Sequence, residues 1–262
     1  DNEEAKDSGT CWLIYGETNF GKSHGLGTAP SPINILVTEP KDARNALAWC
    51  KAEGIDVNFT ECEQFDDYMD HLTSLERQAK DGTLKYKTVA LDSLSFLQGI
   101  FKSKFEDDHA ERVSIKKNLV TLYDRFSMGD DTLMGWGGLA SLLKRITAGL
   151  NRLSKYGVTT IATATELSNP KYKGAAGAFY VAGPSFQGRE YPSQMMGYYD
   201  VIGRLVEPWK IVEGVIRKPR VSFVSPDSDY VARATGRLAP VGENMPYNIS
   251  KILKVMKGEP EE

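Results

Sequence analysis

The sequence of 262 residues has few cysteines and no long apolar run. Its cysteines, Cys11, Cys50 and Cys62, are odd in number and lack the spacing of a zinc site. Neither a disulfide framework nor a zinc centre is therefore expected, and a reducing cytosol is favoured. No apolar segment reaches the roughly 20 residues that span a bilayer, so we expect no membrane partner. Residues 1–10 are acidic and polar, unlike a signal peptide, and are expected to form a disordered tail.

The sequence also lacks an excess of positive charge, since its net charge is -3. Proteins whose surfaces bind nucleic acid broadly are usually basic. A nucleic-acid site would therefore have to be a local patch or be assembled from several copies of the chain. The hydrophobic content of 41% and charged content of 26% are ordinary for a globular protein.

Apolar runs bounded by turn residues alternate with segments of helical period. We expect strands at 11–15, 33–38, 88–92, 158–165, 199–206 and 220–224, helices at 42–53, 65–80 and 139–156, and exposed loops at 129–138 and 168–192. This alternation predicts an α/β fold with a mostly parallel central sheet flanked by helices. We expect the core to cover residues 11–240, followed by a short helix and an acidic tail in 241–262.

One motif carries strong chemical information, because residues 16–23 fit G-x-x-x-x-G-K-[ST] at every position. The candidate nucleotide-binding residues are Gly16, Glu17, Thr18, Asn19, Phe20, Gly21, Lys22, Ser23 and the following His24. A strand is expected before the motif and a helix after it, so backbone N–H groups and the helix N-terminus would face a phosphate. Lys22 would neutralise the β- and γ-phosphates, and the Ser23 hydroxyl would bind Mg²⁺. The alternative is a chance match in a glycine-containing turn.

Two carboxylates follow other predicted strands of the same sheet. Asp92 ends the strand at 88–92, where it could hold Mg²⁺ through water, or it could cap a helix that begins at residue 94. Ser93 could perform that capping equally well. Glu39 follows the strand at 33–38 and could deprotonate the water that attacks the γ-phosphate. The alternative for Glu39 is a surface carboxylate at a strand–helix turn.

This order of motifs resembles the RecA-like P-loop NTPase core, over roughly residues 11–240. The chain is most similar to phage nucleotide-binding ATPases of the single-strand annealing type. The resemblance implies ATP and Mg²⁺ as ligands, Lys22, Glu39 and Asp92 as catalytic residues, and single-stranded DNA as a partner. It also implies self-association into a ring or filament, and a cytoplasmic location in a phage-infected or prophage-bearing bacterium.

The sequence departs from the family at two places. RecA-type cores carry a glutamine sensor at the end of the strand that corresponds to 158–165, whereas this chain offers Thr165 or Glu166 there. Related hexameric ATPases present a Lys-x-Arg pair to the neighbouring subunit. Arg233 and Arg237 are the candidate trans-acting arginines here, although their spacing differs and a solvated arginine is the alternative.

The resemblance also places DNA-binding loops at 124–138 and 168–192. The first contains Asp130 and Asp131, which disfavour phosphate contacts. The second interleaves cations with aromatic rings, as single-strand binding requires. Its candidate residues are Lys171, Tyr172, Lys173, Phe179, Tyr180, Phe186 and Arg189. The alternatives are a mobile loop whose aromatic side chains pack back on the core, and a subunit interface.

The most consistent function is an ATPase that acts on single-stranded DNA in phage-type recombination or replication. One alternative is a nucleotide-gated assembly protein with slow turnover, for which the missing glutamine sensor leaves room. A P-loop small-molecule kinase is a further alternative, but the basic lid of such kinases is not evident in the sequence.

Overall fold

The computed structural model describes residues 9–101, 133–168, 182–186, 196–212, 215–225, 229–234, 238 and 242–259. The strands are β1 (Cys11–Gly16), β2 (Ile33–Val37), β3 (Val57–Glu61), β4 (Thr88–Asp92), β5 (Thr159–Ser168), β6 (Ala182–Pro184), β7 (Val201–Glu207), β8 (Lys210–Val212), β9 (Val215–Arg217), β10 (Arg220–Ser222) and β11 (Met245–Pro246). The helices are α1 (Lys22–Leu26), α2 (Pro40–Ala52), α3 (Phe65–Lys80), α5 (Leu133–Ser154), α7 (Ile249–Lys257), the 3-10 turn η3 (Met196–Tyr198) and a helical segment at 94–101.

Nine strands form one mostly parallel sheet. Its order is β11-β10-β7-β1-β5-β4-β2-β3, and β6 pairs with β5 outside this path. The six strands β7, β1, β5, β4, β2 and β3, which follow one another in the sheet, run parallel. Strands β10, β11 and β6 are antiparallel to their neighbours. The central strand β1 is buried along its whole length, as expected for a parallel strand with both faces covered. The phosphate motif therefore begins at the end of the most protected strand.

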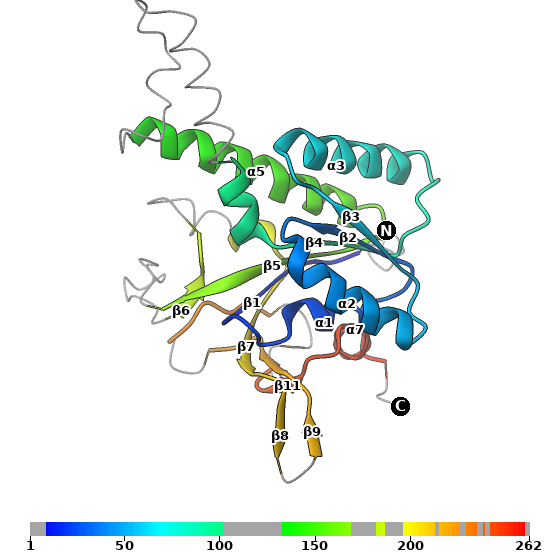
Figure 1. Ribbon diagram of the computed structural model, residues 1–262, viewed down its shortest axis with the longest axis vertical. Helices are drawn as coiled ribbons and strands as arrows, with labels where there is room; N and C mark the ends of the chain where they lie inside the picture. The colour runs from blue at the N-terminus through cyan, green and yellow to red at the C-terminus, as the bar shows by residue number, and fades with distance from the viewer. Residues whose placement is uncertain are drawn as a thin grey trace, which may run out of the picture.

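Helices cover both faces of the sheet and create two apolar cores (Figure 1). On one face, α3 and α5 pack over a core that includes Tyr15, Phe101 and Leu150. On the other face, α1, α2 and α7 lie over a core that includes Trp12 and Phe223. Alternate side chains of β1 enter the two cores, because successive residues of a strand point to opposite faces.

Most predicted elements are confirmed, with shifts of a few residues at their ends. The strands at 11–15, 33–38, 88–92 and 158–165 correspond to β1, β2, β4 and β5. The helix at 65–80 coincides with α3, whose first turn is closed by reciprocal hydrogen bonds between Gln64 and Asp67. The α/β class with a mostly parallel sheet flanked by helices is thus observed.

Several predicted boundaries are corrected. The glycine-rich segment 129–138 is helical from Leu133 onward, because α5 begins there. Residues 182–184, expected within a loop, form β6 and pair with the end of β5. Strand β3 and the hairpin β8–β9, which projects from the body in Figure 1, were not predicted. Beyond residue 240, β11 extends the sheet and α7 buries Ile249, Ile252 and Leu253 in the core that contains Trp12.

Within the described part of the chain, none of the helices combines the length and apolarity that crossing a membrane requires.

Candidate nucleotide site

The candidate site lies where the carboxyl ends of the parallel strands meet. In an open parallel sheet this edge is the usual place for a ligand. A cavity of about 670 Å³ opens there beside the loop that follows β1. Its lining includes Thr18, Asn19, Gly21, Lys22, Ser23, His24, Glu39, Trp49, Asp92, Ser93, Phe96, Thr165 and Trp209. Four residues selected from the sequence for nucleotide chemistry, Lys22, Ser23, Glu39 and Asp92, therefore share one cavity.

The loop at 16–21 has the backbone geometry that its glycines permit. Gly21 has a φ of 89° and Asn19 a φ of 66°, both in the left-handed region that favours glycine and asparagine. The Lys22 ammonium group donates hydrogen bonds to the carbonyl oxygens of Gly16 at 2.9 Å and Glu17 at 2.7 Å. The cation is therefore held inside the curve of the loop, where an anion would bind.

The helix that the sequence predicts after the loop is present but short. Helix α1 has five residues and ends at Gly27, and Pro30 and Pro32 follow it. A helix this short has a small macrodipole, so the N–H groups of the loop and the Lys22 cation must dominate any phosphate interaction. Gly25 lets α1 pack against Tyr247, because a Cβ atom there would lie 1.8 Å from Cε1 of the tyrosine.

A direct hydrogen bond joins the two halves of the predicted metal site. The Ser23 hydroxyl donates to Oδ2 of Asp92 at 2.6 Å, and the hydroxyl of Thr163 on β5 donates to Oδ1 of the same carboxylate. Ser93, not Asp92, has its side chain at the start of the helical segment 94–101, where it accepts from the N–H of Phe96 at 3.4 Å. The hydrogen bonds from Ser23 and Thr163 direct the Asp92 carboxylate toward the loop at 16–21. Because Ser93 provides the cap, the capping alternative for Asp92 is removed.

The backbone next to Asp92 is held in place by Thr38. The Thr38 hydroxyl accepts from the N–H of Ser93 at 2.9 Å and donates to the Ser93 carbonyl at 3.0 Å. The Thr38 N–H also donates to the carbonyl of Asp92 at 2.9 Å. These bonds connect the ends of β2 and β4 and fix the position from which the Asp92 carboxylate reaches Ser23.

Glu39 lies one residue beyond Thr38 and lines the same cavity. It occupies the position before the first turn of α2, but its side chain makes no capping hydrogen bond to that helix. Val37, two residues earlier, pairs with Asp92 across the sheet. Glu39 therefore lines the cavity from the end of β2.

The donors of the site suit a hard divalent cation. Ser23 and Asp92 offer hydroxyl and carboxylate oxygens, the ligand types that Mg²⁺ prefers. Among the described residues, no group of three His, Cys, Asp or Glu side chains could hold a metal by itself. A magnesium ion would therefore need oxygens from water or a bound phosphate in addition to these two residues.

The two sensor candidates at the end of β5 have different surroundings. The Thr165 N–H donates to the Ser95 hydroxyl at 3.0 Å, which connects it to the helical segment after Asp92. Glu166 forms a bidentate ion pair with Arg204 on β7, at 2.9 and 2.8 Å, and its side chain is 3% exposed. The hydrogen bonds that Arg204 donates to the Glu166 carboxylate raise the pKa of the Arg204 guanidinium above its ordinary value. This ion pair spans β1, which lies between β5 and β7 in the sheet.

Arg233, one of the two candidate trans-acting arginines, lies away from the phosphate loop of its own chain. Its guanidinium donates to the carbonyl oxygen of Met196 at 3.2 Å, and its backbone pairs with Ile202 near the start of β7. The start of β7 lies beside the start of β1, and therefore at the other end of the strands from the loop that follows β1. Arg237 is outside the described residues.

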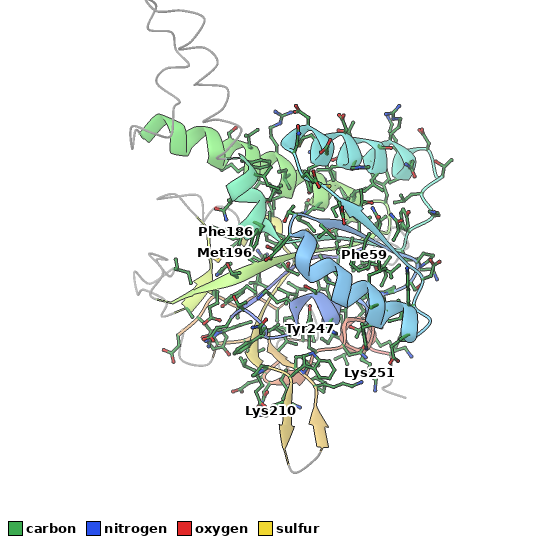
Figure 2. The ribbon with its side chains drawn as sticks, in the orientation of Figure 1. Phe59, Phe186, Met196, Lys210, Tyr247 and Lys251 are labelled. Carbon is green, nitrogen blue, oxygen red and sulfur yellow. The ribbon has the colours of Figure 1, made fainter. Side chains whose placement is uncertain are left out.

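Most candidate DNA-binding residues also fall outside the described residues, namely Lys171, Tyr172, Lys173, Phe179, Tyr180 and Arg189. Phe186 is described, is 6% exposed, and packs in the core beneath α5 (Figure 2). It therefore follows the alternative in which an aromatic side chain packs back on the core. In this structure its ring is not presented to a nucleic acid.

Sequence reasoning missed the aromatic side of the cavity, formed by Trp49, Phe96 and Trp209. Trp209 follows β7 and packs on the phosphate loop, since a Cβ atom at Gly21 would lie 2.7 Å from its indole ring. For Trp209 the sequence offered only a tryptophan three residues after the strand predicted at 199–206. Thr38 and Thr163, which hold Asp92, were also missed, because β-branched residues are common in strands for packing reasons alone.

Neither a scan against models of known protein families nor a search of curated proteins produced a match to this chain.

Proposed function

We propose that the chain is a Mg²⁺-dependent ATPase of the RecA-like P-loop class that acts on single-stranded DNA. The observation that carries the proposal is the hydrogen bond from Ser23 to Asp92, at 2.6 Å. These residues are 69 positions apart in the sequence, and the sequence analysis gave both as candidate magnesium ligands of one nucleotide site. Their contact within a cavity that also contains Lys22 and Glu39 supports one site with four complementary roles.

The proposed reaction is in-line attack of water on the γ-phosphorus of ATP. Glu39 accepts a proton from the water, a new P–O bond forms, and the bond to the β-phosphate oxygen breaks to release ADP. Lys22, held against the loop, neutralises negative charge that develops on the phosphate oxygens. Ser23 and Asp92 would hold Mg²⁺, which supplies further neutralisation of the phosphate charge. Thr38 and Thr163 keep the Asp92 backbone and carboxylate oriented for this task.

The sheet supports the RecA-like assignment. Strands β1, β5, β4 and β2 follow one another in the sheet and run parallel, so the loop, Thr165, Asp92 and Glu39 all emerge at the carboxyl ends of the strands. The order of these parts along the chain is the order on which the resemblance rests. Arg233 lies near the start of β7, at the other end of the strands from the loop at 16–21, so it does not act on a nucleotide in its own chain. A role toward the nucleotide of a neighbouring subunit would require self-association, which is part of the proposal.

The test is the rate of ATP hydrolysis with and without a single-stranded oligonucleotide. We expect Mg²⁺-dependent release of phosphate that the oligonucleotide stimulates. Lys22→Ala should abolish this activity, because the loop then lacks its only cation, whereas Lys155→Ala, one residue beyond the end of α5, should not. Activity that persists in the Lys22→Ala protein would contradict the assignment of the site.

The same assay separates the alternative functions. Slow turnover that DNA does not change would favour a nucleotide-gated assembly protein. Transfer of phosphate to a small metabolite in place of water would favour a kinase.

A further inference from the structure

Three ring side chains form a continuous wall on one side of the cavity, and we call Trp49, His24 and Trp209 the aromatic wall. The His24 ring centroid lies 5.3 Å from that of Trp49 and 6.0 Å from that of Trp209. The three residues come from α2, α1 and the segment between β7 and β8. Three separate elements therefore bring rings together beside the phosphate loop.

The wall is close to the loop but is not sealed in the core. Trp209 is 36% exposed, although its indole ring packs directly on Gly21. Lys210, the next residue, lies at the root of the β8–β9 hairpin (Figure 2) and forms an ion pair with Glu207 at 2.7 Å. The ion pair between Glu207 and Lys210 therefore joins the residues on either side of Trp209. Part of the indole ring remains accessible from the cavity.

The cavity has two chemically different regions. Lys22, Ser23 and Asp92 make one region polar and charged, whereas the rings of the aromatic wall, with His24 inclined by 47° to Trp49 and by 64° to Trp209, make the other largely apolar. The aromatic wall therefore offers ring surfaces next to the Lys22 ammonium group within the same cavity.

We infer that the aromatic wall binds the base of the nucleotide by stacking, with Trp209 as the main contact, and that it selects purine over pyrimidine nucleoside triphosphates. This inference rests on the proposed function, because the phosphate loop must hold the other end of the same ligand. Stacking responds to ring area more than to the hydrogen-bonding edge of a base. A two-ring base therefore gains more from the wall than a one-ring base.

The experiment compares the affinities of Mg²⁺-bound ATP, CTP and inorganic tripolyphosphate by titration calorimetry. The proteins are the wild type, Trp209→Ala, Trp209→Phe and the control Tyr156→Ala, which removes an exposed ring near the end of α5. We expect Trp209→Ala to weaken ATP binding by roughly 5- to 150-fold, the effect of losing about 1–3 kcal/mol of stacking. Tripolyphosphate binding should not change, and Trp209→Phe should retain most of the ATP affinity. The wild type should bind ATP more tightly than CTP.

The outcomes distinguish this inference from the proposed function. If Trp209→Ala weakens ATP and tripolyphosphate equally, Trp209 acts only by packing on the loop and the inference is overturned. Equal affinity of the wild type for ATP and CTP overturns the purine selection. If Trp209→Ala does not fold, the Trp209→Phe protein decides, because its smaller ring must reduce the preference for ATP over CTP while its tripolyphosphate affinity is kept, and an unchanged preference overturns the inference. Failure of the wild type to bind either ATP or tripolyphosphate would refute the proposed function itself.

Discussion

Removing one partner of the ion pair between Glu166 and Arg204 should destabilise the sheet around β1, because the other partner is then left without its counter-charge. Replacing Glu166 by Gln keeps the shape of the side chain but removes its charge, and it turns an NH₂ group toward the guanidinium donors. The Glu166 side chain is 3% exposed and that of Arg204 is 27% exposed. Breaking a fully buried ion pair costs about 3–5 kcal/mol. Because water reaches part of Arg204, and because its guanidinium also lies 4.8 Å from the Tyr230 ring, we expect a loss of about 2–3 kcal/mol.

The chain contains a matched control for this substitution. Arg152 and Glu76 form a pair with the same two-bond geometry, at 3.2 and 2.7 Å, but their side chains are 53% and 25% exposed. Surface pairs of this kind contribute about 0.2–1 kcal/mol, so Glu76→Gln should be nearly neutral. Chemical unfolding of the two variants and the wild type measures the difference. Glu166→Gln should also lower the midpoint of thermal unfolding by roughly 4–12 °C. Equal losses in the two variants would refute the argument from burial.

Three further predictions concern the site, its packing and its thiols. Glu39→Gln should preserve ATP affinity but slow single-turnover hydrolysis roughly 10²–10⁴-fold, and a normal rate would place the base elsewhere. Gly25→Ala should destabilise the fold by about 1–3 kcal/mol in urea unfolding, since its Cβ would overlap Tyr247, whereas Gly99→Ala has open space and should be neutral or stabilising. Burial raises the pKa of the Cys62 thiol from 9.0 to about 12, so its contribution to stability is lost as pH rises above 9.0. Alkylation of Cys62 at pH 8 should consequently be slow in the native protein and fast after unfolding, and rapid native labelling would contradict this.

The sequence predicted best those parts of the site that short-range chemistry determines. The spacing of Gly16, Gly21 and Lys22 predicts a phosphate-binding loop, and the acidic end of an apolar strand singled out Asp92 as a candidate ligand of the same site. Because parallel strands end at a common edge, these residues could be expected to meet without knowledge of any contact. The hydrogen bond between Ser23 and Asp92 follows from that arrangement.

Long-range register and side-chain packing were not accessible in this way. Strand β3 reads Val57-Asn58-Phe59-Thr60-Glu61 and lies at an edge of the sheet, so its half-polar pattern resembled a loop. The pairing of Glu166 with Arg204 depends on the registers of β5 and β7 against β1, which no local pattern encodes. The position of Trp209 against Gly21 likewise depends on how the segment after β7 folds back over the loop.

The central claim is that the loop at 16–23 holds a triphosphate with its magnesium ion. Calorimetric titration of the wild type and of the Lys22→Ala and Asp92→Asn proteins with ATP, with and without Mg²⁺, tests it most directly. We predict that the wild type binds one ATP per chain, that Mg²⁺ strengthens this binding, and that Asp92→Asn removes the magnesium effect. Lys22→Ala should bind no ATP. Equal ATP binding by the wild type and the Lys22→Ala protein would contradict the account.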